Sequence, residues 1–249
     1  MTDFLSIFLL STLGSIAGLI GGTVFFLSEK IKNWFCRYSV PFAAGILLTV
    51  AILSLTPEAH HEIGETAFLI VLITFLVSYV FEQLFFDIHH HDEHSHRPSK
   101  AAVPLVIAGD TIHNFIDGVA IAAAYLTNPG LGLIVALSTF LHETPHEIGD
   151  FGVLLAAGWS RSKALLANFL SALSTYLGAF FVIYVAQEAE WFTGSLLAVA
   201  AGMFLYLGAS DFLPKPTDKK DVNVKKIAAL LVGVVIMIVA TTLVPHAHE

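Results

Sequence analysis

The most constraining feature of this chain is a series of eight apolar stretches, each long enough to cross a lipid bilayer as a helix. A spanning helix needs about 20 mostly apolar residues. The stretches lie at residues 4–27, 39–58, 66–86, 102–126, 131–157, 162–187, 191–213 and 226–245. The first lacks a preceding basic segment and is too long for a signal peptide, so we expect it to be the first membrane helix. The connections are short, and we predict one all-α integral membrane domain of eight transmembrane helices over residues 1–249.

The composition agrees with this prediction and excludes other classes of protein. Only 13% of the 249 residues are charged and 56% are hydrophobic, whereas a soluble domain carries about 25% charged residues. The single cysteine, Cys36, excludes an intrachain disulfide and a cysteine-based zinc or iron–sulfur site. The net charge of -8 argues against a nucleic-acid partner. The lipid bilayer is therefore the expected environment, and the 12 histidines are an excess that needs a functional explanation.

The basic residues predict the orientation of the helices. All 12 Lys and Arg side chains follow the first, third, fifth and seventh stretches, whereas the other connections carry acidic residues such as Glu62, Glu65 and Glu188. Basic connections of membrane proteins face the cytoplasm. We therefore expect a multi-pass protein of the cell (inner) membrane, with the odd-numbered connections in the cytoplasm and both termini outside.

Two stretches share five identical residues at a constant offset of 157 positions. They are Ala43, Ala44, Gly45, Leu48 and Pro57 in the second stretch, and Ala200, Ala201, Gly202, Leu205 and Pro214 in the seventh. The two stretches run in opposite directions across the membrane. One interpretation is chance identity between Ala-rich helices, and the other is an inverted-topology repeat of the kind found in many secondary transporters. We favour the inverted repeat.

The fourth and fifth stretches carry the chemistry of the chain. Their polar residues are Asp110, His113, Asn114 and Asp117 in the fourth, and His142, Glu143, His146, Glu147 and Asp150 in the fifth. An ionisable group at the bilayer centre costs about 2.5–3.5 kcal/mol, so five carboxylates imply a penalty on the order of 15 kcal/mol. A purely structural pair of helices would not need such groups.

The spacing of these residues favours a metal site between the fourth and fifth helices. Residues four apart share a helix face, so His113 pairs with Asp117 and His142 with His146. Two such pairs facing each other supply four ligands, and imidazoles with carboxylates suit zinc while tolerating iron, cobalt, nickel or manganese. A second ion could be held by the neighbouring Asn114 and Glu143, with Asp117 as a bridge. The alternative is a hydrogen-bonded polar core without metal.

A competing interpretation comes from the string His142-Glu143-Thr144-Pro145-His146, which fits the HExxH signature of zinc proteases. In those enzymes the glutamate is the general base toward zinc-bound water. Proline between the glutamate and the second histidine is poorly suited to a regular helix that must aim both imidazoles. A protease also does not need the second polar motif on the fourth helix. An intramembrane zinc metalloprotease therefore stays the alternative function.

The two motifs together resemble those of a known family. The segment from His113 to Gly118 is similar to the HNxxDG motif, and the segment from His142 to Asp150 matches the HExPHExGD motif, of the ZIP metal transporters, specifically the LIV-1 branch. The resemblance implies a homodimeric carrier, not an enzyme, that imports zinc into the cytoplasm, with iron, manganese and cadmium as further candidate substrates. It also implies the ligand sets His113, Asp117, His142 and His146 for a first metal, and Asn114, Asp117 and Glu143 for a second.

Other features modify this expectation. In some branches a carboxylate on the sixth helix completes the second metal site, but the segment from Ser171 to Gly178 has no acid. The predicted cytoplasmic connection, residues 87–101, contains the histidine-rich run His89–His96, whose composition is typical of metal binding or of a solvated linker. Glu82 and Asp211, near helix ends, are further candidates for lining the path of the ion.

Overall fold

A computed structural model of the chain describes residues 2–15, 19–20, 28–86, 103–185, 190–213 and 224–244. Over these residues the chain contains eight continuous helical rods and no strand. Six of the rods are long and apolar enough to cross a membrane. The prediction of an all-α integral membrane protein is confirmed.

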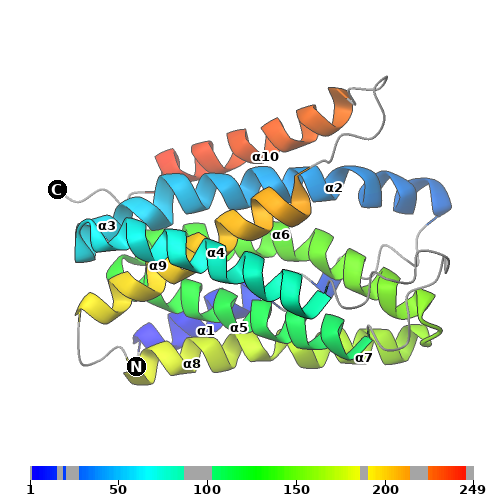
Figure 1. The fold of residues 1–249 in the computed structure, drawn as a ribbon, viewed down its shortest axis with the longest axis horizontal. Helices are drawn as coiled ribbons and strands as arrows, with labels where there is room; N and C mark the ends of the chain where they lie inside the picture. Colours follow the sequence, from blue (N-terminus) through cyan, green and yellow to red (C-terminus); the bar gives the residue numbers. More distant parts are fainter. Residues whose placement is uncertain are drawn as a thin grey trace.

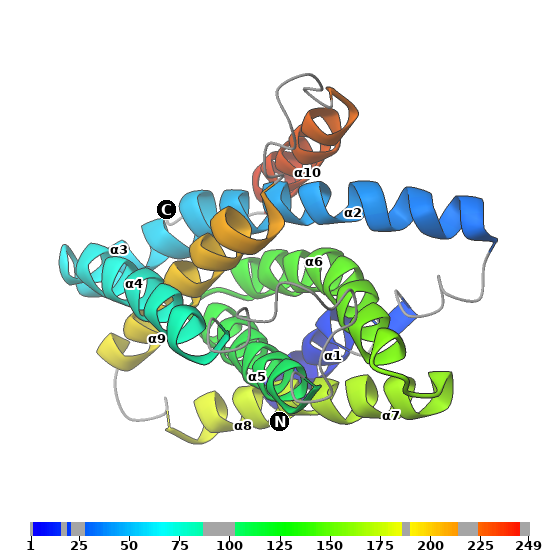
Figure 2. The ribbon, with the colours of Figure 1, turned by 45° about the vertical axis from the view of Figure 1, so that its right-hand side comes forward.

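Successive helical rods alternate in direction along the long axis of the molecule (Figure 1), and over the described residues they are built from ten α-helices. They are α1 (Thr2–Gly14), α2 (Glu29–Val50), α3 (Thr56–Ile63), α4 (Thr66–Phe86), α5 (Val103–Thr127), α6 (Pro129–Ala156), α7 (Arg161–Ala172), α8 (Ser174–Val185), α9 (Glu190–Tyr206) and α10 (Val224–Leu243). Two π-helical segments, Ala51–Leu55 and Leu207–Phe212, follow α2 and α9. Figure 2 shows that α2 and α3 form one long rod, Glu29–Ile63, and α7 and α8 likewise form the rod Arg161–Val185.

The second helix is longer than the sequence predicted. The six rods from α4 onward match the predicted stretches within two residues at each end, but the rod expected over 39–58 begins at Glu29 and ends at Ile63. Its first turns carry an ion pair of 2.7 Å between the Lys32 ammonium and the Glu29 carboxylate, and such pairs at i,i+3 stabilise a helix. The basic segment expected as a connection is therefore helical, because hydropathy marks the apolar core of a span and not its charged extension.

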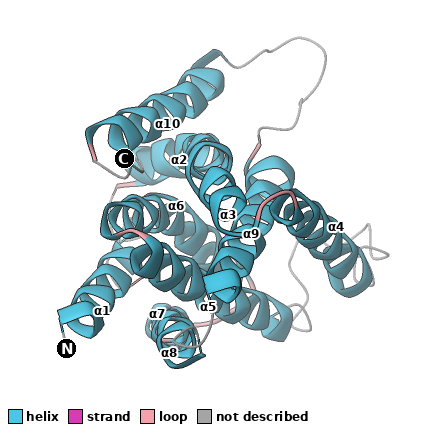
Figure 3. Cartoon of the chain, turned by 90° about the vertical axis from the view of Figure 1, so that its left-hand side faces the viewer, coloured by secondary structure: helices cyan, strands magenta, loops and turns pink. Residues whose placement is uncertain are grey.

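Two long helices occupy the centre of the bundle. Figure 3 shows α5 and α6 with α1, α7 and α8 on one side and α2 and α9 on the other. Helix α10 packs outside α2, and α4 packs outside α9. Both outer helices leave most of their apolar side chains uncovered, as the lipid-facing helices of a membrane protein do.

The predicted inverted repeat has counterparts in local structure. The π-helical segment Ala51–Leu55, shifted by 157 positions, falls on residues 208–212, which lie within the second π-helical segment. A Cβ atom on Gly45 would overlap the α10 backbone, and one on Gly202 would overlap the α4 backbone. The α2–α10 and α9–α4 pairs therefore pack closely at equivalent glycines.

The first π-helical segment has a local cause. Pro57 cannot donate a backbone hydrogen bond, and its ring crowds the carbonyl one turn earlier. The Thr56 backbone N–H donates to the Ala51 carbonyl, five residues back, and the Thr56 hydroxyl donates to the same oxygen at 2.7 Å. The Ala51 carbonyl oxygen in this wide turn thus has its hydrogen bonds before the chain reaches the proline.

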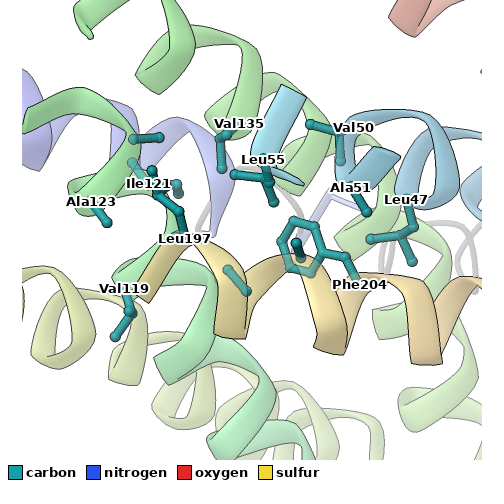
Figure 4. Close-up of a cluster of buried hydrophobic side chains, with 14 of the residues drawn as sticks. Leu47, Val50, Ala51, Leu55, Val119, Ile121, Ala123, Val135, Leu197 and Phe204 are labelled. Carbon is teal, nitrogen blue, oxygen red and sulfur yellow. The ribbon is translucent and has the colours of Figure 1, made fainter. Parts of the chain in front are cut away.

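The apolar core lies beside the polar centre and closes it on one side. Phe204 of α9 is fully buried among side chains of the second rod, including Ala51 and Leu55 (Figure 4). The ring centroid of Phe204 also lies 5.4 Å from that of His142. The core therefore keeps water from this side of the polar residues on α5 and α6.

Candidate metal site

The polar residues of α5 and α6 are held in register by local features of the sequence. Asn128 caps α6, because its side-chain oxygen accepts hydrogen bonds from the backbone N–H groups of Gly130 and Leu131 at 2.8 and 3.3 Å. Such capping fixes where a helix starts. On the other side of α5, a Cβ atom on Gly118 would overlap the Thr175 carbonyl oxygen of α8, so the glycine allows the two backbones to touch.

Four ligand atoms from α5 and α6 converge on one point. The Nε2 atoms of His113 and His142 lie 3.3 Å apart. His113 Nε2 lies 2.8 Å from Glu143 Oε1 and 3.8 Å from Asp117 Oδ2. His142 Nε2 lies 3.3 Å from Asp117 Oδ2 and 3.9 Å from Glu143 Oε1. Ligands about 2.0 Å from one tetrahedral zinc ion are about 3.3 Å apart, so these residues, the four-ligand cluster, have the spacing of a single zinc site.

The four-ligand cluster is buried, and in the described part of the chain the groups nearest its carboxylates are the two imidazoles. The exposed fraction of each of its four residues is 3% or less. Within the part of the chain that the structure describes, neither carboxylate oxygen of Asp117 or of Glu143 accepts a hydrogen bond. Buried anionic oxygens are costly unless a cation or a donor compensates them. The arrangement therefore fits a bound cation.

The tautomer of His142 also suits metal binding. Its Nδ1 atom lies 2.9 Å from the Ser138 carbonyl oxygen, which can only accept, so Nδ1 carries the proton. The neutral ring then presents the Nε2 lone pair to the four-ligand cluster. Metal-ligating histidines are commonly oriented by this kind of second hydrogen bond.

The structure places His146 differently from the predicted first ligand set. The set expected was His113, Asp117, His142 and His146, but Glu143 is the fourth member of the cluster, and His146 groups with Asp110 and Asp150. His146 lies one turn further along α6 than His142, where its Nδ1 atom is 3.6 Å from Asp110 Oδ1 and 3.8 Å from Asp150 Oδ2. We call these three residues the cavity-facing group.

Asn114, predicted as a ligand of a second ion, lies between the two groups. Its side-chain nitrogen donates to Asp110 Oδ1 at 2.8 Å, and its side-chain oxygen accepts from the Thr175 hydroxyl at 3.2 Å. The amide thus holds Asp110 in position and links α5 to α8. One lone pair of its oxygen stays available for a cation.

The sixth predicted helix contributes polar residues that the sequence analysis left without a role. The Asn168 amide donates to Glu147, and the Ser174 hydroxyl donates to the Thr111 carbonyl oxygen at 2.8 Å. Asn168, Ser171 and Thr175 are spaced by three and four residues, so they share one face of the α7–α8 rod. That spacing is the signal from which a polar face, including the Asn168 contact, was predictable.

A cavity of about 380 Å³ opens beside the site between α4, α5, α6 and α9. Its polar lining includes all three residues of the cavity-facing group, together with His113 and Glu82. Glu82, a candidate from the sequence for lining the path of the ion, thus lines this cavity. The Asp211 side chain and the histidine-rich run His89–His96 lie outside the described part of the structure.

Comparisons with known proteins agree with the motifs. The sequence model of the ZIP Zinc transporter family matches residues 89–241. Zinc transporter ZIP10 of Homo sapiens is 42% identical over 138 residues, which are 51% of this chain and 17% of that protein. Zinc transporter ZIP4 of Mus musculus is 43% identical over 120 residues, which are 47% of this chain and 18% of that protein.

The matched segments thus span less than a fifth of these two relatives. The names of the relatives describe transporters, so the protease alternative has no support. The family match covers more than half of the chain and includes both metal-binding motifs, and the chain therefore belongs to the ZIP zinc transporter family.

Proposed function

We propose that this chain carries zinc across the membrane into the cytoplasm, and that the ion binds at the four-ligand cluster on its way. The observation that carries the proposal is the convergence of two imidazole nitrogens and two carboxylate oxygens, in which each nitrogen lies 2.8–3.9 Å from the other nitrogen and from both oxygens. The names of the relatives, all zinc transporters, support zinc as the substrate.

Charge balance explains how such a site suits a low-dielectric environment. Two ionised carboxylates and two neutral imidazoles carry two negative charges, which a divalent ion neutralises. A neutral, fully coordinated ion costs far less at mid-membrane than a bare ion or bare carboxylates would. Two imidazoles favour zinc, while the two carboxylates leave iron, manganese and cadmium as further candidate substrates.

All six predicted site residues have a place in this proposal. His113, Asp117, His142 and Glu143 coordinate the buried ion directly. Asn114 and His146 lie at its border, where Asn114 fixes Asp110 and His146 receives the ion as it moves toward the cavity. The whole chain, residues 1–249, acts as one transport domain, with the His89–His96 run as an accessory metal-capture segment in the cytoplasm.

The proposed orientation of the molecule rests on where its basic residues lie. The N-terminal ends of α2, α7 and α10 lie at the same end of the bundle in Figure 1. The described basic residues gather there, namely Lys30, Lys32, Arg37, Arg161, Lys163, Lys225 and Lys226. By the positive-inside rule we propose that this end faces the cytoplasm and that both termini lie outside the cell (inner) membrane.

The uncovered outer helices support a homodimer. Side chains such as Leu72 and Leu76 of α4, and Leu231 and Val235 of α10, are about half exposed in the single chain. We propose that part of this apolar surface contacts a second copy and the rest contacts lipid. Cysteine cross-linking between copies at exposed positions of α4 and α10, in native membranes, tests the dimer.

Reconstitution of the purified chain into liposomes tests the function. We expect saturable accumulation of zinc inside the vesicles, above that of protein-free liposomes, and no cleavage of a co-reconstituted membrane-protein substrate. Uptake no greater than in protein-free liposomes would refute the carrier. Cleavage of the substrate without zinc uptake would favour the metalloprotease.

A further inference from the structure

We propose that the cavity-facing group, Asp110, His146 and Asp150, is a second zinc site, from which the ion leaves the protein. The proposal rests on the zinc-transport function given above. It differs from the predicted second site, because its ligands are Asp110 and Asp150, which the motif analysis left unassigned, together with His146.

The geometry of the group matches that of a zinc site with one nitrogen and two oxygen ligands. His146 Nδ1 lies 3.6 Å from Asp110 Oδ1 and 3.8 Å from Asp150 Oδ2, close to the separation of about 3.3 Å between ligands of one tetrahedral zinc. Among the described residues, His146 Nδ1 and Asp150 Oδ2 have no hydrogen-bond partner although both atoms are buried. Asp110 is only 4% exposed, and the Asn114 side-chain nitrogen orients the Asp110 carboxylate by donating a hydrogen bond to its Oδ1 atom.

The cavity-facing group differs from the four-ligand cluster in its access to water. The side chains of His146 and Asp150 are 20% and 18% exposed, and all three residues line the cavity of about 380 Å³. A zinc ion with three protein ligands keeps an open position for water. An ion here is therefore held by fewer ligands and exchanges more readily than an ion in the buried cluster.

The two sites are adjacent, so an ion can pass from one to the other. The ring centroids of His113 and His146 lie 4.7 Å apart, and His113 belongs to the four-ligand cluster while also lining the cavity. Asp110, Glu143 and Glu147 also bring carboxylate oxygens within 4.8 Å of one another. Carboxyl oxygens that can bind a cation therefore lie all along the way between the two sites.

The cavity extends from this group toward the predicted cytoplasmic side. Its lining includes Phe81 and Glu82, near the last turns of α4, and Val106, in the first turns of α5. These turns flank the connection that the basic residues place in the cytoplasm. The cavity-facing group therefore lies between the buried ion and its destination, with Glu82 as the next carboxylate along the path.

Zinc titration of the purified full chain by calorimetry tests the second site. We expect a tight and a weaker class of zinc site in the unmodified chain, in addition to binding by the His89–His96 run, which is subtracted by titrating a variant with serine at the five histidines of that run. Asp150→Asn should lower the zinc affinity of the weaker class by about tenfold or more and leave the affinity of the tight class unchanged. His142→Ala should lower the affinity of the tight class and leave the weaker class unchanged. Glu65→Gln, an exposed acid outside both groups, is the matched control and should keep both classes. Size-exclusion profiles and thermal unfolding midpoints establish that each variant is folded.

The outcome distinguishes failure of this proposal from failure of the proposed function. If folded Asp150→Asn titrates like the unmodified chain, or loses the tight class with the weaker one, the second site is refuted. If the unmodified chain binds two classes of zinc but liposomes accumulate none, the transport function fails while the site stands. With both correct, Asp150→Asn should also lower the maximal uptake rate by about tenfold with little change in KM for zinc.

Discussion

At the scale of single residues, the proposed zinc binding depends on the charge of two carboxylates and on two neutral imidazoles beside them. Each close contact that the structure gives between a nitrogen and the carboxylates of Asp117 and Glu143 is with a histidine, at 2.8–3.9 Å. Neutral histidines do not cancel the charge of two carboxylates, so the ion itself must do so. Replacing a ligand therefore changes both the affinity for the metal and the choice of metal.

The choice of metal is tested by His142→Glu. The substitution replaces an imidazole nitrogen with a carboxylate oxygen, which is a harder ligand. We expect the variant to retain uptake and to shift its preference from zinc toward manganese, measured as the ratio of manganese to zinc uptake in liposomes. A ratio equal to that of the unmodified chain would show that His142 is not a ligand of the transported ion.

The motif residues were predictable from the sequence, but their grouping was not. Spacing along α5 and α6 predicted that His113 and Asp117 share a face, as they do at 3.8 Å. The pattern within one helix does not specify how two helices are rotated about their axes. For that reason Glu143, predicted for a second ion, joins the first cluster, and His146 turns toward Asp110.

At the scale of helices, close backbone contacts position the site. The contact between α5 and α8 depends on Gly118 and Gly178, because a Cβ atom on either would overlap a carbonyl oxygen of the other helix. Asn114 is bonded to Thr175 across the same interface. The fit of these helices therefore determines where the α5 ligands lie.

Two glycine substitutions test this contact. Gly118→Ala forces α5 and α8 apart, and we expect it to lower the thermal unfolding midpoint of the purified protein by several degrees, corresponding to about 1–3 kcal/mol. Gly149→Ala is the matched control, because a Cβ atom on Gly149 has no neighbour within 4 Å among the described residues. It should leave the midpoint equal or higher, since alanine favours the helix. Equal midpoints for the two variants would contradict the close packing of α5 on α8.

The apolar stretches predicted most helices well, and the departures have physical causes. The span 66–86 was predicted to the residue, because α4 is apolar over most of its length. The first turns of α2 were missed because they are charged, and the π-helical turn before Pro57 was missed because hydropathy does not depend on backbone hydrogen bonds. Hydropathy also does not predict glycine contacts between helices. Gly45 and Gly202 were noted only because they match in the predicted repeat.

At the scale of the whole molecule, two outer helix pairs, α2 with α10 and α9 with α4, surround a polar centre. The described basic residues belong to the N-terminal ends of α2, α7 and α10, which lie at one end of the bundle (Figure 1), and the cavity lining includes residues near that end. Orientation and import are thus linked, because an inverted molecule would open the same cavity to the outside.

Cysteine labelling in intact cells tests the orientation. After Cys36→Ser removes the exposed native thiol, a cysteine at Glu65, between α3 and α4, should react with a membrane-impermeant reagent added outside. A cysteine at Arg161, at the start of α7, should react only after the membrane is permeabilised. The reverse pattern would overturn both the orientation and the direction of transport.

The central claim is that the four-ligand cluster binds the zinc ion that crosses the membrane, and Asp117→Asn tests it most directly. The substitution keeps the shape of the side chain and removes the charge and one anionic ligand oxygen. The measurement is the initial rate of zinc uptake into liposomes at equal amounts of folded, incorporated protein. The predicted result is a rate about 10–100-fold below that of the unmodified chain, and an equal rate would contradict the site.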